Sequence, residues 1–282
     1  MAVSGLMFIV AANFINGKQG AVEFKQGMND INTQINAVLN DVTNGFYPST
    51  QNFTCVVNTP ANPLSTPRFD AGTTDQGSNA GCIFIGKVMQ FRVGSDATKY
   101  NIFSLTARQS NTLGTPVTSF ATALPIAVDA TASGPSYFGL GANTVNLTQR
   151  NQLEYGLTLE KALLCTGDCS ASLGMPIGMF GFFGSLGNYG VSSSADPQSG
   201  AQTVVTASIP SSSLNQTEAN AAATINSKAK LISSSEVLGN GKYILLCFKN
   251  GNRPGSIKIG GSNSQQLTTT LDLGVGIPAV CP

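Results

Sequence analysis

The sequence predicts an α+β protein with one long N-terminal helix and a large antiparallel β-body held together by disulfides. Three observations predict this fold class. The first 45 or so residues carry an apolar stripe at helical spacing, the chain after Pro48 alternates and turns as β-structure does, and all six cysteines fall in that later part. At 282 residues, the chain can bury a core as one large domain or two modest ones.

The predicted helix covers residues 1–46. Its small and apolar positions alternate steps of four and three residues, which keeps one side of a helix apolar. The stripe consists of Val3, Met7, Val10, Phe14, Gly17, Ala21, Phe24, Met28, Ile31, Ile35, Val38 and Val42. A helix of this length would extend about 60 Å, far beyond the usual three turns of a globular helix.

Two unlike halves make up this helix. From Ala2 to Ala12 it has no charge and is apolar on nearly all sides, so residues 1–15 are predicted to lie in a membrane or a filament core. From Lys18 onward it is amphipathic, so residues 18–46 are predicted to lie along the body. The intervening segment 16–20 is predicted to be a softened joint, since each of its two glycines costs about 1 kcal/mol relative to alanine.

The apolar half has about half of the ~20 residues that cross a bilayer. No basic segment precedes it and no small-residue cleavage site follows, so it does not read as a secretory signal peptide. We interpret it as the second half of a membrane-spanning stretch. The expectation is that the first half is missing, through trimming or through a start codon assigned inside the gene.

Composition excludes several classes of function. Charged residues make up 10% of the chain and the net charge is +1, so nothing predicts binding to nucleic acid. The chain has no histidine, which removes the usual general base and the commonest metal ligand. Acidic pairs such as Asp70/Asp75 and Glu154/Glu160 could serve as glycosidase carboxylates, but surface charges are the simpler interpretation. We therefore expect no enzyme activity and no cofactor.

The six cysteines favour disulfides and hence an extracytoplasmic body. Six cysteines allow 15 pairings, and sequence alone does not choose among them. Proximity along the chain favours Cys55–Cys82, Cys165–Cys169 and Cys247–Cys281. The competing interpretation is zinc at Cys165 and Cys169, whose spacing suits two ligands.

The body, residues 47–282, begins after the turn residues at 44–48. Residues 55–82 read as irregular. The next predicted elements are a buried strand at 82–93, a turn at 94–97, a hairpin partner at 100–105, loop with short strands at 112–146, and a strand pair within 152–164. A subdivision of the body near residue 150 is left open.

The C-terminal part reads as alternating strands with one short helix. A helix is predicted at 214–227, where Asn215 and Glu218 resemble a capping box. The predicted strands are 177–186, 203–209, 241–248, 256–259 and 268–273, with a loop at 190–201 and a hairpin turn at 250–252.

One segment suggests a metal site. Asp70, Asp75 and Asn79 cluster oxygen ligands of the kind that calcium prefers, which makes them a calcium hypothesis. Their spacing matches no EF-hand loop, and a solvated turn is the alternative. We favour the solvated turn and therefore predict no metal site.

The run Ala2–Ala12 (AVSGLMFIVAA), with a small-residue step at Gly5, resembles the second half of the N-terminal helix of type IV pilins and pseudopilins. The strand regions 82–93 and 179–186 and the closing segment 247–281 are similar to the bodies of minor pilins and minor pseudopilins. The leader, its cleavage site and the glutamate near the mature start have no counterpart, so no docking residue carries over. Gly17 and Gly20 stand where these helices often have proline.

The resemblance implies a structural subunit of a type IV pilus or of a type II secretion-like filament. It would be anchored in a bacterial membrane before assembly and extracellular afterwards. Its implied partners are other pilin subunits, reached through the N-terminal helix, and the inner-membrane assembly machinery. The large body would suit a tip or adhesive role toward a host cell or surface ligand.

Two other interpretations fit the helix. Heptad-like spacing suits a trimeric coiled-coil stalk, which would make the protein a secreted fibre or adhesin with a β head. Gly17 and Ala21 in the stripe, with few flanking opposite charges, favour the pilin-like interpretation instead. The third alternative is a helix packed wholly on its own domain.

Overall fold

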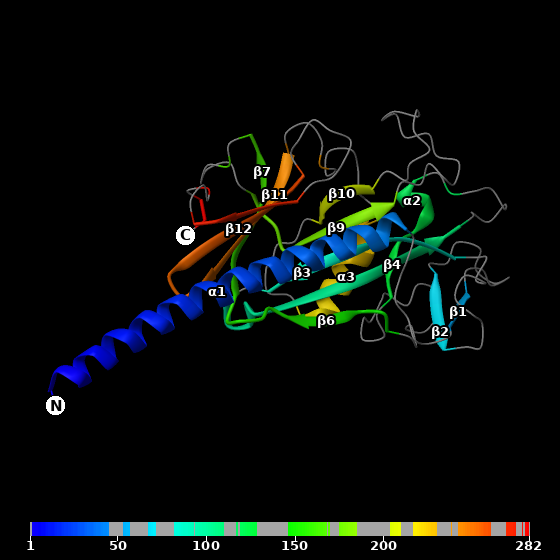
Figure 1. The fold of residues 1–282 in the computed structure, drawn as a ribbon. Coiled ribbons are helices and arrows are strands. Elements are labelled where there is room, and N and C mark those ends of the chain that lie inside the picture. The colour runs from blue at the N-terminus through cyan, green and yellow to red at the C-terminus, as the bar shows by residue number, and fades with distance from the viewer. Residues whose placement is uncertain are drawn as a thin grey trace.

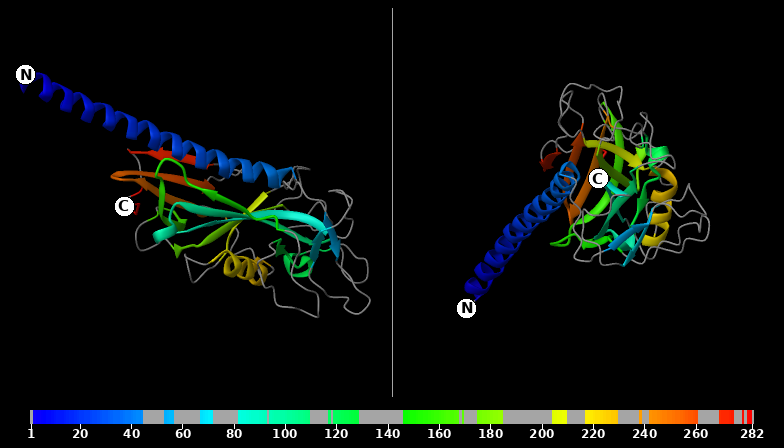
Figure 2. Two further views of the ribbon diagram at one scale, coloured as in Figure 1. Left: turned by 90° about the horizontal axis from the view of Figure 1, so that it is seen from below. Right: turned by 90° about the vertical axis from the view of Figure 1, so that its right-hand side faces the viewer.

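The computed structural model describes residues 2–44, 53–56, 67–71, 82–92, 94–109, 117, 119–128, 146–167, 169, 175–184, 204–209, 217–229, 238, 242–260, 269–274, 278 and 280–281. Helix α1 (Ala2–Thr43) precedes a body of antiparallel sheets, which confirms the α+β class. The helix runs along the body and continues past it at the N-terminal end (Figures 1 and 2).

The strands form three sheets, and every paired strand is antiparallel to its neighbour. The smallest contains β1 (Phe53–Val56) and β2 (Arg68–Ala71). The six-stranded sheet contains β3 (Cys82–Phe91), β4 (Lys99–Arg108), β5 (Ile126–Ala127), β6 (Gln149–Gln152), β9 (Met179–Gly184) and β10 (Val204–Ile209). The five-stranded sheet contains β7 (Thr158–Thr166), β8 (Met175–Pro176), β11 (Lys242–Asn250), β12 (Arg253–Gly260) and β13 (Thr269–Leu273).

Local sequence explains the two long hairpins. Strands β3 and β4 pair from Cys82–Arg108 to Phe91–Tyr100 around the one-turn 3-10 helix η1 (Gly94–Asp96), as predicted. Strands β11 and β12 are joined by Gly251 and Asn252, and Gly251 has a φ of 58°, which a glycine adopts without strain. The predicted closing strands are therefore confirmed.

Helix α1 and helix α3 (Glu218–Lys228) lie on opposite faces of the six-stranded sheet (Figure 2). The core beneath α3 contains Ala221, Ala222 and Ile225 of the helix, packed with Phe103 and Leu105 of β4. The core beneath α1 is richer in aromatic residues and draws on both large sheets.

Phe91 of β3 connects the two large sheets within the core beneath α1. Its ring stacks on Phe180 of β9 at 6.1 Å and meets Phe248 of β11 edge-on at 5.9 Å. Tyr100 of β4 stacks on the other side at 5.3 Å. Aromatic contacts of this kind contribute about 0.5–1.5 kcal/mol beyond burial, so they hold both sheets under one helix.

The structure corrects the predicted strand pair within 152–164. Strands β6 and β7 belong to different sheets, since β6 pairs with β4 and β7 with β11. Tyr155 and Gly156 between them both have positive φ, so the chain changes direction there instead of forming a hairpin. Because β9 returns to pair with β3 and β10 pairs with β9, residue 150 does not divide the sheets from each other.

Two helical details also differ from prediction. Helix α3 begins later than predicted, with Thr217 as its N-cap accepting from the Asn220 amide, and not with Asn215. Within the region predicted as loop with short strands, the structure has the one-turn helix α2 (Phe120–Ala123). Ser119 and Thr122 cap it reciprocally, an arrangement in which a threonine takes the place of the usual Glu or Gln.

Candidate assembly surface: the helix and its exit from the body

The C-terminal half of α1 is bound to the body by the predicted stripe. Every stripe position from Phe24 onward is buried against the two large sheets, with contacts to strands of both. These residues are Phe24, Met28, Ile31, Ile35, Val38 and Val42. Each such side chain contributes about 1.5–3 kcal/mol when buried, so this half of the helix is an integral part of the body.

A glycine of β12 lets the helix approach closely. A Cβ added at Gly255 would lie 2.8 Å from Phe24 Cζ and 2.9 Å from Met28 Cε. Two polar contacts also join α1 to the strands. Lys87 Nζ of β3 lies 2.5 Å from Asp41 Oδ2 of α1, and Thr269 Oγ1 of β13 donates to Asn36 Oδ1 at 3.1 Å.

The helix leaves the body near Gly20 and Gly27. A Cβ at Gly20 would lie 2.9 Å from Arg253 Nη1, and one at Gly27 would lie 3.3 Å from the Glu154 carbonyl oxygen. The N-terminal part of the α1 backbone extends beyond the β-body (Figures 1 and 2). The helix is continuous through residues 16–20. The predicted joint therefore coincides with the point of exit, and its softness stays a prediction.

Two large apolar side chains are exposed beside this exit. Among the described residues, Val22 is 62% exposed and Tyr155 39% exposed. Gln26 lies one helical turn after Val22 on the same side of α1, and its Nε2 donates to the Tyr155 hydroxyl at 2.5 Å. We call Val22, Gln26 and Tyr155 the exit patch.

The backbone of Tyr155 is unusual. Its φ is 55°, a left-handed conformation that costs a bulky side chain about 1–3 kcal/mol. The neighbouring turn holds it, since Asn250 Nδ2 donates to the Tyr155 carbonyl oxygen at 2.6 Å. A glycine at this position would remove the strain. An exposed aromatic residue held in a strained backbone points to a use for the ring.

No helix, within the part of the chain that the structure describes, has a stretch long and apolar enough to cross a membrane.

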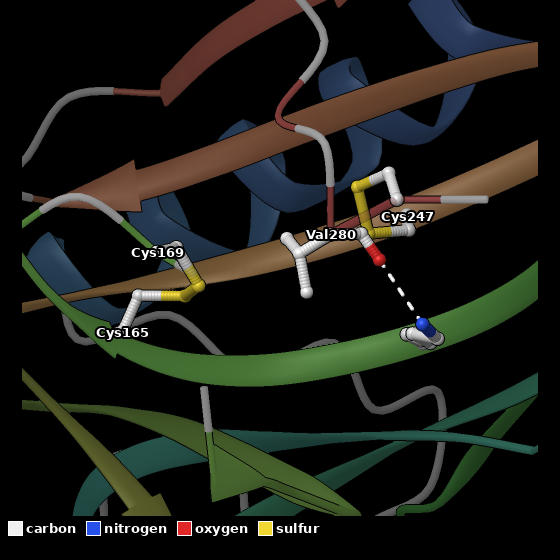
Figure 3. The surroundings of a disulfide bond; sticks show 6 residues. Cys165, Cys169, Cys247 and Val280 are labelled. Carbon is white, nitrogen blue, oxygen red and sulfur yellow. Dashed lines mark hydrogen bonds between the residues drawn. A yellow bond between two sulfur atoms is a disulfide. The ribbon is translucent and has the colours of Figure 1, made fainter. Parts of the chain in front are cut away.

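Two disulfides lie on the outer face of the five-stranded sheet. The predicted bridges Cys165–Cys169 and Cys247–Cys281 are confirmed, which excludes the zinc alternative at Cys165 and Cys169. Figure 3 shows Val280 between the two bridges, and Lys161 Nζ donates to its carbonyl oxygen at 3.0 Å. The tail thereby covers this face of the sheet.

The third predicted bridge is only partly described. Cys82, at the start of β3, is disulfide-bonded. Cys55 lies in β1, but its side chain is outside the described residues, so the pairing Cys55–Cys82 stays a prediction.

The calcium hypothesis is not tested by the structure. Asp70 lies in β2 with its side chain outside the described residues, and Asp75 and Asn79 are outside them altogether. In the described ranges, no group of three or more potential metal-ligating side chains is found. Glu160, one of the acidic pair considered above, forms an ion pair with Lys249 at 2.9 Å.

No protein-family model matches the chain, and no curated protein and no solved structure is significantly similar to it.

Sequence reasoning missed the residues that position the helix. Lys87 stands alone in the apolar run CIFIGKVMQF, and a single lysine inside a buried strand is the signal that predicts a buried ion pair. Tyr155 precedes a glycine in the sequence EYGL, whose alternation predicts a strand. Its left-handed backbone has no signal in residue type, since tyrosine rarely adopts it.

Proposed function

We propose that this protein is a pilin-like structural subunit that assembles through α1. In this proposal it is a minor pilin or minor pseudopilin of a type IV pilus or of a type II secretion-like filament. The subunit is anchored in a bacterial membrane before assembly and then becomes part of an extracellular filament. Its partners are other pilin subunits and the inner-membrane assembly machinery. The exposed body suits a tip or adhesive role.

The division of α1 carries the proposal. Its second half is buried on its own body, whereas the uncharged segment Ala2–Ala12 belongs to the half that extends past the body. An uncharged helix of this kind requires apolar surroundings. Lipid supplies them before assembly and the helices of neighbouring subunits afterwards, so one surface serves both states.

The exit patch supports assembly into an open filament, to which further subunits can always be added. The projecting segment and the exit patch are different surfaces of one molecule, so a contact between them on two copies is heterologous. Such contacts build open helical filaments when the rotation does not close a ring. Val22 and Tyr155 would then contact the projecting helix of the neighbouring subunit.

The burial of the second half of α1 on its own body disfavours the alternative of a secreted fibre or adhesin with a coiled-coil stalk. A stalk needs the stripe residues of its whole length at the interface between chains. In this protein Ile31 and Ile35 are 3% and 0% exposed, because the body already covers them.

Cysteine cross-linking of the full chain tests the proposal. Val10→Cys places a thiol on the projecting half, and Ile35→Cys places one on the docked half as the matched control. In detergent or vesicles under mild oxidation, we expect Val10→Cys to give covalent dimers and Ile35→Cys to give none. Electron microscopy of the same samples would look for filaments.

Dimers from both variants would support the coiled-coil stalk, since its stripe lies between chains along its whole length. A monomeric product from both variants, at concentrations where the unmodified chain assembles, would contradict the pilin-like arrangement.

A further inference from the structure

Arg108, the last residue of β4, is a buried cation that has no counter-ion among the described residues. Its side chain is 5% exposed. Its Nε donates to the Thr122 carbonyl oxygen of α2 at 2.6 Å, while its Nη1 is buried and has no hydrogen-bond partner in the described part of the chain. Burial lowers the pKa of the guanidinium, because desolvation disfavours its charged form.

Other arginines of the body have carboxylate partners. Arg92 pairs with Asp96 at 2.7 Å and Arg150 with Glu218 at 2.5 Å, although both of these arginines are far more exposed than Arg108. Within the described residues, no carboxylate pairs with Arg108. Burying an unpaired charge raises the free energy of the folded state. A bound anion would compensate the charge of Arg108.

Unpaired hydroxyl groups lie on the same face of β4. Ser104, Thr106 and Arg108 alternate along the strand and so share one face. The hydroxyls of Ser104 and Thr106 are buried, and neither has a partner within the ranges that the structure describes. Thr106 and Arg108 are about 7 Å apart along the strand. A single oxyanion with a hydrogen bond on each side fits a gap of this order.

Lys87 is directly opposite Ser104 in the sheet, but Asp41 already neutralises its charge. The local excess therefore comes from Arg108. An anion is the one partner that would compensate the charge and accept from the free donors at the same time.

We propose that Arg108 and Thr106 form a binding site for an oxyanion, that is, a carboxylate, sulfate or phosphate group. A guanidinium presents parallel N–H donors that match such groups. Helix α2, which receives the Arg108 Nε bond, lies at the end of the body away from the N-terminus of α1 (Figure 1). The site is thus remote from the proposed assembly surface.

Thermal unfolding of the full chain tests the site, with inorganic phosphate as the probe and chloride at matched ionic strength as the reference. We expect saturating phosphate to raise the melting temperature by at least about 2 °C. Arg108→Met should abolish this difference, and Arg150→Met should retain it. Thr106→Val should weaken the phosphate response about tenfold in concentration through loss of one hydrogen bond.

Stability without phosphate separates a ligand site from a structural role. If the Arg108 charge is uncompensated without a bound anion, Arg108→Met should unfold in chloride at the same temperature as the unmodified chain or at a higher one. A large loss of stability in Arg108→Met, with no phosphate effect on the unmodified chain, would overturn the proposal. So would an equal phosphate effect in both proteins.

A sulfated polysaccharide distinguishes the source of the anion. An Arg108-dependent response to phosphate alone would assign a small free ion. A response to the polysaccharide as well would assign an acidic group on a larger surface ligand.

Discussion

Lys87 and Asp41 form an ion pair that joins strand β3 to the last turns of α1, with Nζ and Oδ2 2.5 Å apart. The lysine side chain is 1% exposed and the aspartate 30% exposed. The pair therefore spans the boundary between the core and water. Together with the close contact at Gly255 and the Thr269–Asn36 hydrogen bond, it fixes the position of the helix along the sheet.

We expect Asp41→Asn to destabilise the fold by about 2–3 kcal/mol, because it leaves a buried ammonium without its counter-charge. This is below the usual cost for breaking a buried pair, since Asp41 retains contact with water. Lys87→Met should cost much less, because the remaining carboxylate can be hydrated. Urea unfolding of both variants measures the order, and a larger loss for Lys87→Met would contradict this account.

Gly255 sets the distance between α1 and β12. We expect Gly255→Ala to destabilise by about 1–3 kcal/mol, because the new methyl group would overlap the ring of Phe24 and the methyl group of Met28. Gly184→Ala is the matched strand control, since its nearest contact would be an ordinary 3.7 Å from the Ile85 carbonyl oxygen.

Shortening Met28 tests the cause of this loss. Met28→Ala in the Gly255→Ala background should cost less than Met28→Ala alone, because the added methyl group then occupies vacated space. Additive losses measured by urea unfolding would mean that the two side chains do not compete for one volume.

Much of this arrangement could be predicted from residue patterns and part of it could not. The stripe of α1 and the hairpins of β3–β4 and β11–β12 are local signals, because periodicity and turn residues specify them within a few positions. The separation of β6 from β7 depends on the backbone of Tyr155, and the return of β9 to β3 depends on contacts far apart in sequence. Neither has a local signal. The isolated Lys87 and Arg108 could have been identified as unusual, but their partners could not.

The two described disulfides should differ in their contribution to stability. Cys247–Cys281 closes a loop with a separation of 34 residues and Cys165–Cys169 one of 4. In the chain-entropy model, their removal costs about 4 and about 2 kcal/mol, respectively. Paired serine substitutions followed by urea unfolding measure both losses. A larger loss at Cys165–Cys169 would contradict the expectation that loop closure sets the order of the two losses.

Tyr100 should make the fold sensitive to high pH. Burial, with a smaller effect from the nearby Glu154 carboxylate, raises the pKa of its phenol to about 12 from an ordinary value of 10.0. The folded state keeps its proton where the unfolded state loses it. This contribution is therefore complete below pH 10 and is lost as the pH rises through about 12.

Unfolding measured between pH 9 and 12 should show this loss, at most about 2–3 kcal/mol. Tyr100→Phe keeps the stacking on Phe91 and removes the titrating group, so its stability should fall less over the same range. Identical pH profiles for the two proteins would assign the loss to other groups.

Tyr155 combines exposure, a strained backbone and a held ring, and these features predict opposite effects on stability and assembly. We expect Tyr155→Gly to stabilise the isolated subunit by about 0.5–1 kcal/mol, because relief of the left-handed strain exceeds the loss of one exposed hydrogen bond. The same change should reduce cross-linking of Val10→Cys chains at least tenfold, since an aromatic anchor is lost. Tyr155→Phe keeps the ring and the strain while removing the hydroxyl that accepts from Gln26. It should therefore assemble nearly as well as the unmodified chain. A subunit that loses stability on Tyr155→Gly and still cross-links fully would show that the ring serves the fold and not the neighbouring subunit.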